Sequence, residues 1–368
     1  MKISFVLTGS GHRPVGGFKV IYEYANRLAA DGHIITLVHP QIANAKIWHP
    51  KIFAAIGLFW WRKFRAAYLP DRWFQLHPKV ICKWVFTPRG KDIPDGDFVF
   101  ATGWNTAKFV ADLPDRCGDR LYFIQHFETW AVKKPDVVLE TWNLDLHKIV
   151  IASWLRDIAK EMGQTACLVP NGLDFEAFGV DQEIRSRQPA SILFLNHWRP
   201  YKGTPDAVEA VEAVVKRHPG AKVRAFGVSP RPEYFPDYVE YFQNPSQTFL
   251  RQLYNDSAIF LAPSHSEGWG LTACEAMICG CAVVATNVGG HREFAVAGHN
   301  ALMVEPNQPE EMAEAALQLV DNSALRFAIS ENGQSSMAEF TWEKSYSKLL
   351  NVLISRSSSR ADAKRSGY

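Results

Sequence analysis

The chain has 368 residues, which is more than one hydrophobic core usually supports, so two α/β-sized domains are expected. Hydrophobic residues make up 47% and charged residues 21%, the balance of a soluble globular protein rather than a disordered or membrane-spanning one. The net charge of +2 is far from the basicity of a dedicated nucleic-acid binder, and we expect no nucleic-acid partner. No apolar stretch reaches the roughly 18 residues that span a bilayer, which predicts a cytoplasmic protein.

The six cysteines lack the paired spacing of a zinc site and form no recognisable disulfide framework. We expect them to be reduced, with no bound metal. The apolar run at residues 3–8 ends in a Gly-rich loop and is too short for a signal peptide, so it predicts a first β-strand.

The N-terminal part repeats a strand and helix pattern. A strand at 3–8, a Gly-rich loop at 9–17, a helix at 18–30 and a strand at 34–38 form a βαβ unit, which predicts a parallel sheet. Further strands are expected at the following ranges: 98–101, 121–124, 149–152 and 167–169. Together they predict one doubly wound domain over residues 1–169.

The same pattern restarts after a polar connector at 181–189. Strands are expected at 191–195, 222–226, 258–262 and 282–286, with helices at 206–217 and 271–278. They predict a second domain at 170–340, then a helix at 341–356 that packs back on the N-terminal domain, and a disordered tail at 357–368. Because open α/β sheets bind ligands at the carboxyl ends of their strands, we expect an active site between the two domains.

The stretch 263–277, with the sequence PSHSEGWGLTACEAM, carries the strongest chemical signal. Glu267 lies in a Gly-containing loop after a strand, and Glu275 lies about a turn inside the following helix. Backbone amides at the start of that helix would favour a diphosphate. Glu275 could accept hydrogen bonds from both hydroxyls of a ribose, and Glu267 could accept them from a sugar. As an isolated pair they could equally be a solvated loop acid and a dipole-favoured helix acid.

The longer pattern, from Glu267-Gly268-Trp269-Gly270-Leu271 through Glu275-Ala276-Met277 to Val288-Gly289-Gly290, closely resembles the signature of glycosyltransferase family 4. This resemblance implies the GT-B fold, in which two Rossmann-like, doubly wound parallel-sheet domains face each other across a cleft. It also implies that Glu275 binds ribose and Glu267 contacts the donor sugar. By the same resemblance, sugar and phosphate are held by the loop and helix-start residues Gly268, Trp269, Gly270, Leu271 and Thr272.

A second segment, at 196–203, resembles the family's Gly-Arg-x-x-x-x-Lys-Gly turn, in which two cations hold the diphosphate. Lys202 matches the lysine. The position of the family's arginine is occupied by His197, so either Arg199 or a protonated His197 would supply the second cation. Arg199 could also be an ordinary surface arginine.

In the N-terminal domain, Gly16-Gly17 resembles the family's glycine loop at the donor phosphate or acceptor. His126 follows a strand and resembles the donor-side histidine that contacts the transferred sugar, although a lone histidine is more often structural. Glu128 is a weaker candidate. Gly9 and Gly11 are not followed by a third glycine at the required spacing, so a dinucleotide-binding fingerprint is absent.

Residues 46–91 contain ten Lys or Arg and a single acid, Asp71, interleaved with aromatic residues. Such a segment can lie on an anionic membrane surface. The alternatives are a solvated basic face over core aromatics and an acceptor groove for polyanionic glycans.

The resemblance implies a retaining, metal-independent glycosyltransferase that moves a hexose or deoxyhexose from a nucleotide-diphosphate sugar to a glycan or lipid-linked acceptor. Cell-surface polysaccharide or lipopolysaccharide synthesis, at the inner face of the plasma membrane, is the expected setting. The nucleotide sugar is a co-substrate, and no cofactor is expected. The alternatives are a catalytically silent GT-B binding module and another sugar-nucleotide enzyme such as an epimerase.

Overall fold

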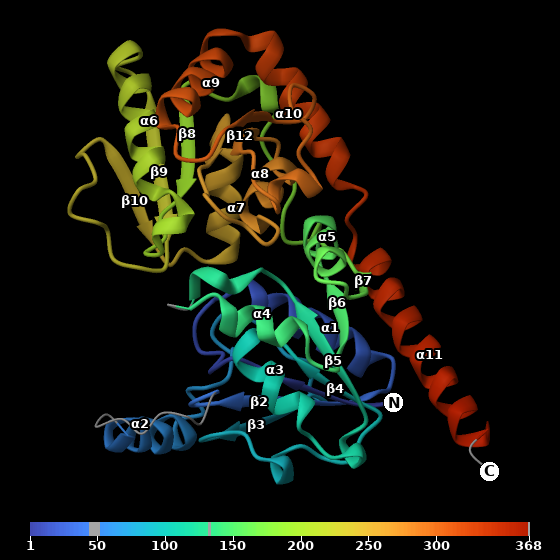
Figure 1. Ribbon diagram of the computed structural model, residues 1–368. Helices are drawn as coiled ribbons and strands as arrows, with labels where there is room; N and C mark the ends of the chain where they lie inside the picture. Colours follow the sequence, from blue (N-terminus) through green and yellow to red (C-terminus); the bar gives the residue numbers. More distant parts are fainter. Residues whose placement is uncertain (44–51, 132–133, 367–368) are drawn as a thin grey trace. The chain divides into compact units, whose positions relative to one another are not determined.

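The computed structural model describes residues 1–43, 52–131 and 134–366 (Figure 1). The chain forms two compact units. The N-terminal unit comprises Met1–Pro170 and Glu343–Tyr368, and the C-terminal unit comprises Asn171–Trp342. The unit boundaries lie within two residues of the ends of the predicted domains, and the last helix of the chain belongs to the N-terminal unit.

The N-terminal unit is built on a parallel sheet of seven strands within the described residues, in the order β3-β2-β1-β4-β5-β6-β7. The strands are β1 Lys2–Val6, β2 Ile34–Pro40, β3 Ile81–Val85, β4 Phe98–Ala101, β5 Asp119–Ile124, β6 His147–Val150 and β7 Ala166–Leu168. The helices of this unit are α1 Gly16–Ala30, α2 Ile52–Phe64, α3 Trp104–Ala111, α4 Asp136–Trp142, α5 Ser153–Glu161 and, beginning at the boundary, α11 Trp342–Ser366. Strand order reverses between β1 and β4, as in a doubly wound fold.

The C-terminal unit contains a parallel sheet of six strands within the described residues, in the order β10-β9-β8-β11-β12-β13. Its strands are β8 Ser191–Leu195, β9 Lys222–Gly227, β10 Val239–Gln243, β11 Ile259–Ala262, β12 Ala282–Thr286 and β13 Leu302–Val304. Its helices are α6 Thr204–Arg217, α7 Gln247–Asn255, α8 Leu271–Ile278, α9 Pro309–Asp321 and α10 Ser323–Met337. The order reverses between β8 and β11.

Alternating side chains of the C-terminal sheet are buried on both faces, which is why these strands read as continuous apolar runs. Ile192 and Phe194 of β8 join α6 and α9 in one core cluster. Leu193, between them, is also fully buried and points to the other face. Figure 1 shows α6 and α8 on either side of this sheet, giving three layers.

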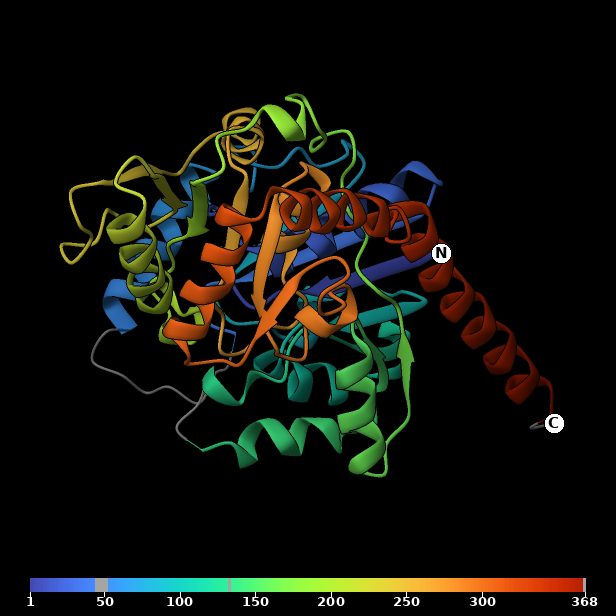
Figure 2. The ribbon, with the colours of Figure 1, turned by 90° about the horizontal axis from the view of Figure 1, so that it is seen from above.

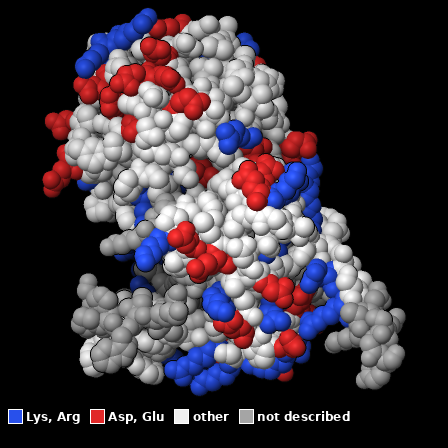
Figure 3. Space-filling view, in the orientation of Figure 1, with Lys and Arg blue, Asp and Glu red and all other residues white. Residues whose placement is uncertain are grey.

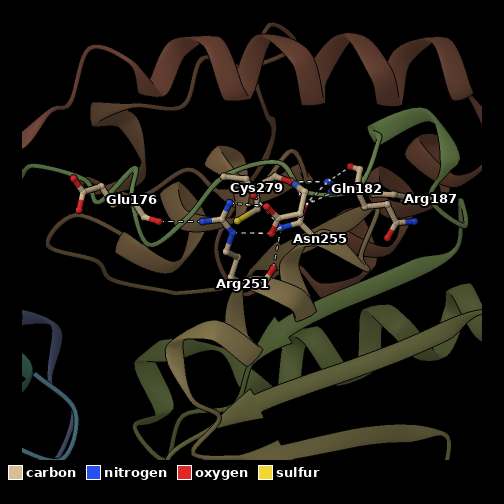
Figure 4. A network of polar contacts seen from close by, with 8 residues as sticks. Glu176, Gln182, Arg187, Arg251, Asn255 and Cys279 are labelled. Atoms are coloured by element: carbon tan, nitrogen blue, oxygen red, sulfur yellow. Dashed lines mark hydrogen bonds and ion pairs between the residues drawn. The ribbon is translucent and has the colours of Figure 1, made fainter.

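The polar connector at 181–189 lies inside the C-terminal unit and is held there by a buried polar network (Figure 4). Arg187 is 3% exposed and donates to the backbone oxygens of Gln182, Ser257 and Cys279 at 3.0, 3.1 and 2.7 Å. Asn255, at the end of α7, accepts from the amide of Asp181 at 2.7 Å. The buried guanidinium is tolerated because its Nη1 and Nη2 groups donate to carbonyl oxygens, and the connector is thereby tied to α7 and α8.

The structure differs from the sequence prediction in three short strands, β3, β10 and β13, which were not predicted. Each is an edge strand of its sheet. The strands β3 and β10 mix polar and apolar residues, and β13 has only three residues, so the pattern carried no strong signal.

The predicted end of the last helix at residue 356 is wrong, because α11 continues to Ser366. No Gly or Pro interrupts this segment, and the hydroxyls of Ser358 and Ser359 donate to carbonyl oxygens one turn earlier. Figures 1 and 2 both show the last turns of α11 extending beyond the sheet of the N-terminal unit. The predicted tail residues 367–368 lie outside the described part of the chain.

Charged side chains are unevenly spread over the C-terminal unit. Acidic residues gather at the top of Figure 3, where exposed glutamates of α6 and α9 lie: Glu209, Glu212, Glu310, Glu311 and Glu314.

In the described part of the chain, every helix is too short or too polar to cross a membrane.

Candidate functional site

The candidate site of the C-terminal unit lies at the point where its strand order reverses. The strands β8 and β11 are neighbours there, and both run in the same direction. The loop after β8 carries Lys202, and the loop after β11 carries Glu267. Two residues 65 positions apart in the sequence are therefore brought together at the carboxyl edge of one sheet, where α/β folds bind ligands.

Glu267 and Lys202 form a charge pair with 2.5 Å between Oε1 and Nζ. Their side chains are only 11% and 20% exposed. Ser264 adds a hydroxyl that donates to the same carboxylate oxygen at 2.8 Å. Burial acts to raise the pKa of Glu267, but the charge of Lys202 outweighs it and lowers that pKa to about 2. The carboxylate is therefore ionised and ready to accept hydrogen bonds at neutral pH.

Backbone contacts hold the two loops against each other. The amide of His265 donates to the carbonyl oxygen of Tyr201 at 2.7 Å. Gly203 follows Lys202 with a φ of 64°, and a Cβ at this position would lie 2.1 Å from the carbonyl oxygen of Pro263. Only glycine fits here, so the position of the Lys202 backbone is set by a close approach between the loops.

A second close contact at a glycine lies at the start of α8. Gly270 caps α8 with a φ of 105°, and a Cβ there would lie 2.7 Å from the ring of His291. Gly290 donates its amide hydrogen to the carbonyl oxygen of Glu267 at 3.1 Å. Helix geometry leaves the first amides of α8, at Leu271 and Thr272, without acceptors inside the helix, so they can donate to an anion.

His291 is 1% exposed and its pKa is lowered by burial, so the ring is neutral at neutral pH. Its Nδ1 lies 2.9 Å from the carbonyl oxygen of Thr286, which can only accept. The proton is therefore on Nδ1, and Nε2 is an acceptor on the side of Gly270. His291 was not predicted as a site residue, although it directly follows the quoted Gly-Gly pair.

Glu275 lies on α8, one turn beyond its start, and is partly exposed. The hydroxyl of Tyr254, from α7, donates to Oε2 of Glu275 at 3.3 Å. Tyr254 is fully buried, and burial raises its pKa well above the ordinary value, so it remains a donor. Tyr254 orients the carboxylate that we predicted to bind a ribose, and no sequence motif pointed to it.

His197 and Arg199 follow β8. Burial, together with the charge of Lys202, lowers the pKa of His197 to about 4, so the imidazole is neutral at neutral pH. Its Nδ1 accepts from the amide of Arg199 at 3.0 Å, which leaves Nε2 as the protonated donor. The guanidinium of Arg199 lies 3.9 Å from the ring centroid of Trp198. Of the two predicted candidates, Arg199 is therefore the one that carries a charge.

A cavity of about 340 Å³ opens beside these residues. Its lining comes from the loop after β8, the start of α6 and the loop after β9: Asn196, His197, Trp198, Arg199, Pro200, Pro205, Ser229, Pro230, Pro232 and Tyr234. Trp198 and Tyr234 are 65% and 55% exposed, so both rings are available for stacking. The lining thus combines segments that follow two neighbouring strands, β8 and β9.

In the N-terminal unit, the predicted residues lie at the carboxyl ends of β1 and β5. Gly16 and Gly17 begin α1, and the amide nitrogen Nε2 of Gln125 donates to the carbonyl oxygen of Gly17 at 3.0 Å. A Cβ at Gly17 would lie 3.4 Å from the Gln125 side chain. His126 follows β5, and its ring lies edge-on to Trp154 at 5.8 Å between centroids.

Glu128 accepts a hydrogen bond from the amide of Trp104, at the start of α3, at 3.0 Å. Burial nevertheless raises its pKa to about 7. A carboxyl group that changes its charge near neutral pH, close to the predicted His126, is a better candidate for a functional role than its sequence context indicated.

Part of the C-terminal unit matches a known family of proteins. Residues 180–336 match the family described as glycosyl transferases group 1. This segment contains Lys202, Glu267 and Glu275. The matched segment lies within the C-terminal unit.

One curated relative, an uncharacterized glycosyltransferase of Methanocaldococcus jannaschii, is 41% identical over 87 residues. That alignment covers 24% of this chain and 25% of the relative, so the chain spans only about a quarter of the relative's length.

Solved structures show the likeness in fold over nearly the whole chain. The sucrose-phosphate synthase of Thermosynechococcus elongatus is similar with a TM-score of 0.74 and 14% identity, covering 97% of this chain and 99% of that one. HepE of Anabaena in complex with UDP-glucose is similar with a TM-score of 0.73 and 17% identity, covering 96% and 100%. The predicted GT-B fold, with two Rossmann-like units, is confirmed.

Proposed function

We propose that the chain is a glycosyltransferase whose C-terminal unit binds a nucleotide-diphosphate sugar. The observation that carries this proposal is the buried Lys202–Glu267 pair beside the start of α8. It combines a cation for phosphate, an ionised carboxylate for sugar hydroxyls and helix amides for a second anionic group, all at the strand-order reversal.

Lys202 can bind Glu267 and a phosphate group at the same time. Its ammonium has three donors, so it can keep the bond to Glu267 and donate to a phosphate oxygen of the donor. Arg199, the neutral Nε2 donor of His197 and the amides of Leu271 and Thr272 would supply further contacts. In our proposal, these groups stabilise the diphosphate as its bond to the sugar breaks, and no metal ion is required.

We assign the ribose to Glu275. The hydrogen bond from Tyr254 orients the carboxylate, and carboxylate oxygens can accept from the two hydroxyls of a ribose. The base would then occupy the 340 Å³ cavity and stack on Trp198 or Tyr234. The structure of HepE with UDP-glucose supports a nucleotide sugar as the class of donor.

The proposed reaction retains the anomeric configuration. The bond between the anomeric carbon and the phosphate oxygen breaks, and the acceptor hydroxyl forms its new bond from the same face of the sugar. The departing phosphate oxygen takes the proton of that hydroxyl, so no side-chain base is needed. We assign His126 and the Gly16-Gly17 loop of the N-terminal unit to contacts with the transferred sugar and the donor phosphate or acceptor, as the family resemblance implies.

The acceptor class that we propose is a glycan or a lipid-linked sugar, used in cell-surface polysaccharide or lipopolysaccharide synthesis. A hexose or deoxyhexose is the proposed transferred group. The inner face of the plasma membrane is the proposed location, because lipid-linked acceptors are found there.

Thermal-shift measurements with UDP, GDP, dTDP and ADP test the donor site. We expect one diphosphate to raise the melting temperature, with and without EDTA. Glu275→Ala should reduce the affinity for it about 10- to 100-fold, because it removes charged hydrogen bonds. Glu305→Ala, an exposed glutamate in the same unit, is the matched control and should bind normally. Equal binding by both variants, or a strict requirement for a divalent metal, would contradict the proposal.

The neutral His197, at the position of the family's arginine, keeps a catalytically silent binding module as the second candidate. Slow hydrolysis of the matching nucleotide sugar, followed by release of the diphosphate, separates the two. We expect hydrolysis above the rate without protein, and its loss in Lys202→Met. Binding without any turnover, in the presence or absence of acceptors, would favour the silent module.

A further inference from the structure

The helix α2, at Ile52–Phe64, is apolar on both of its faces. One face packs on the edge of the N-terminal sheet: Phe59 stacks on Trp84 of β3 with 5.6 Å between ring centroids, and Trp84 in turn stacks on Tyr68 at 5.2 Å. The indole of Trp84 also donates to the carbonyl oxygen of Phe59 at 3.0 Å. On this face, some of the aromatic residues of segment 46–91 pack into the core of the N-terminal unit.

The other face of α2 is exposed. Its side chains recur at intervals of three to four residues, which places them along one stripe of the helix. They are Phe53 at 82%, Ile56 at 39%, Trp60 at 46% and Phe64 at 82% exposed, with Trp61 at 52% beside them. Scattered exposed apolar residues are ordinary, but a continuous aromatic stripe on a helix marks an interaction surface.

Cations border this stripe at the C-terminal end of α2. Lys63 lies 5.0 Å from the ring centroid of Trp60, and Arg65 lies 6.0 Å from that of Trp61. Arg62 is on the side of Trp84, at 5.9 Å from its ring. The sequence of α2 contains no Asp or Glu.

Further positive charge lies close by. Burial lowers the pKa of His12, and the positive charges of Arg62, Arg13 and Arg72 lower it further, so all three arginines act on this ring. Asp71 is the single acid of segment 46–91. A partner for the α2 surface must therefore be apolar in its interior and negatively charged at its border.

We propose that the exposed stripe of α2, with Lys63 and Arg65, docks on the surface of an anionic phospholipid bilayer. Aromatic rings insert at the level of the lipid headgroups while cations meet acidic lipid. The 13 residues of α2 measure about 20 Å, less than the roughly 30 Å of a bilayer core, which fits a helix lying along the surface. Residues 46–51 of the basic segment lie outside the described residues.

Vesicle co-sedimentation tests this surface. The full chain is mixed with vesicles of phosphatidylcholine alone or of phosphatidylcholine with phosphatidylglycerol, at low and high salt. We expect binding to the anionic vesicles and little binding to the neutral ones. The double variant Lys63→Gln/Arg65→Gln should reduce binding by about fivefold for each cation removed, and high salt should produce a similar loss.

The triple variant Trp60→Ser/Trp61→Ser/Phe64→Ser should reduce vesicle binding at least tenfold. The matched control is Val296→Ser/Ile354→Ser, two side chains that are 57% and 55% exposed on other elements, and it should bind as the unchanged protein does. Circular dichroism and the nucleotide-induced thermal shift should be the same for all variants, which excludes unfolding as the cause.

Three results would overturn the proposal. Equal vesicle binding by the triple variant and the unchanged protein would show that the stripe does not contact lipid. A dimer of the unchanged protein that the triple variant loses, without vesicle binding, would assign the stripe to a second copy. Binding of a soluble acidic polysaccharide that depends on the cations alone would assign it to a glycan. Because the assay contains no nucleotide, it can fail while the proposed transferase function stands, and the reverse also holds.

Discussion

Glu267 is a carboxylate that burial would protonate and that Lys202 keeps ionised. A buried charge is costly unless it is paired, and here one cation and one hydroxyl provide the pairing. Lys202 is in turn placed by Gly203, whose close approach to Pro263 tolerates no side chain. The position of Lys202 thus depends on Gly203, a neighbour that has no functional side chain.

The low pKa of Glu267 predicts a specific loss of stability in acid. Its value of about 2 lies below the ordinary 4.5, so the folded state binds this proton less readily than the unfolded state. The resulting stabilisation is present above about pH 4.5 and is lost as the pH falls towards 2. We expect the unchanged protein to lose more unfolding free energy over this window than Glu267→Gln does, by on the order of 2 kcal/mol.

Urea denaturation at several pH values, followed by fluorescence, measures this difference. Glu331→Gln is the control, because its pair with Arg185 is half exposed on both sides and should contribute little. Parallel loss of stability in Glu267→Gln and in the unchanged protein would show that Lys202 does not hold this carboxylate ionised.

At the scale of elements, α8 begins where two glycines allow the loops after β11 and β12 to meet. Gly270 turns the chain into the helix, and Gly290 brings the loop after β12 against residues 267–269. The helix can then present its first amides at the edge of the sheet. This arrangement explains why a Gly-rich loop, a helix and a distant Gly-Gly pair occur together in one motif.

Gly270→Ala should disrupt this arrangement. It combines a φ of 105° with a contact of 2.7 Å to His291, and we expect a loss of about 2–4 kcal/mol in stability together with weaker nucleoside diphosphate binding. Gly298→Ala is the matched control in the same unit, because its φ of 70° is also positive but nothing lies within 4 Å of the new Cβ. It should cost about 1 kcal/mol and leave binding unchanged. Equal effects of the two variants, in melting and in calorimetric titration, would refute a role for the His291 contact.

The elements that could be predicted from the sequence are those with a strong apolar pattern. The central strands β1, β8, β11 and β12 are buried on both faces and were predicted close to their observed ends. The edge strands β3 and β10 were missed because they mix polar and apolar residues, and β13 was missed because it has only three residues. The extension of α11 was missed because polar composition was taken as a sign of disorder.

At the scale of the whole molecule, the chain enters the C-terminal unit after Pro170 and returns to the N-terminal unit after Trp342. The returning helix α11 is tied there by side chains along its length. Tyr346 donates to Asp31 at 2.6 Å, and Arg356 forms an ion pair with Asp119 at 2.7 Å. Leu349 and Leu353, which lie between these contacts, are fully buried.

Leu349→Ala should therefore weaken the N-terminal unit rather than the C-terminal unit, although it lies nearly 180 residues beyond the first segment of that unit. We expect a loss of about 2–5 kcal/mol, typical of a cavity in a core. Hydrogen exchange should increase in β1 and β5 and remain unchanged in β8 and β11. Ile354→Ala, on the exposed side of the same helix, is the control and should change neither. Increased exchange confined to the C-terminal unit would contradict this assignment of α11.

The sequence by itself determined two parallel-sheet units, the motif around Glu267 and Glu275, and a basic aromatic segment. These features depend on apolar periodicity and on the spacing of residues that are close in sequence, and both can be seen without a structure. Only the tertiary structure decided that Lys202 pairs with Glu267, that Tyr254 orients Glu275, and that His197 is neutral. These facts depend on which loops meet where the strand order reverses and on how much water the surrounding side chains exclude. Similarly, only packing on Trp84 decided which face of α2 is core and which is left exposed.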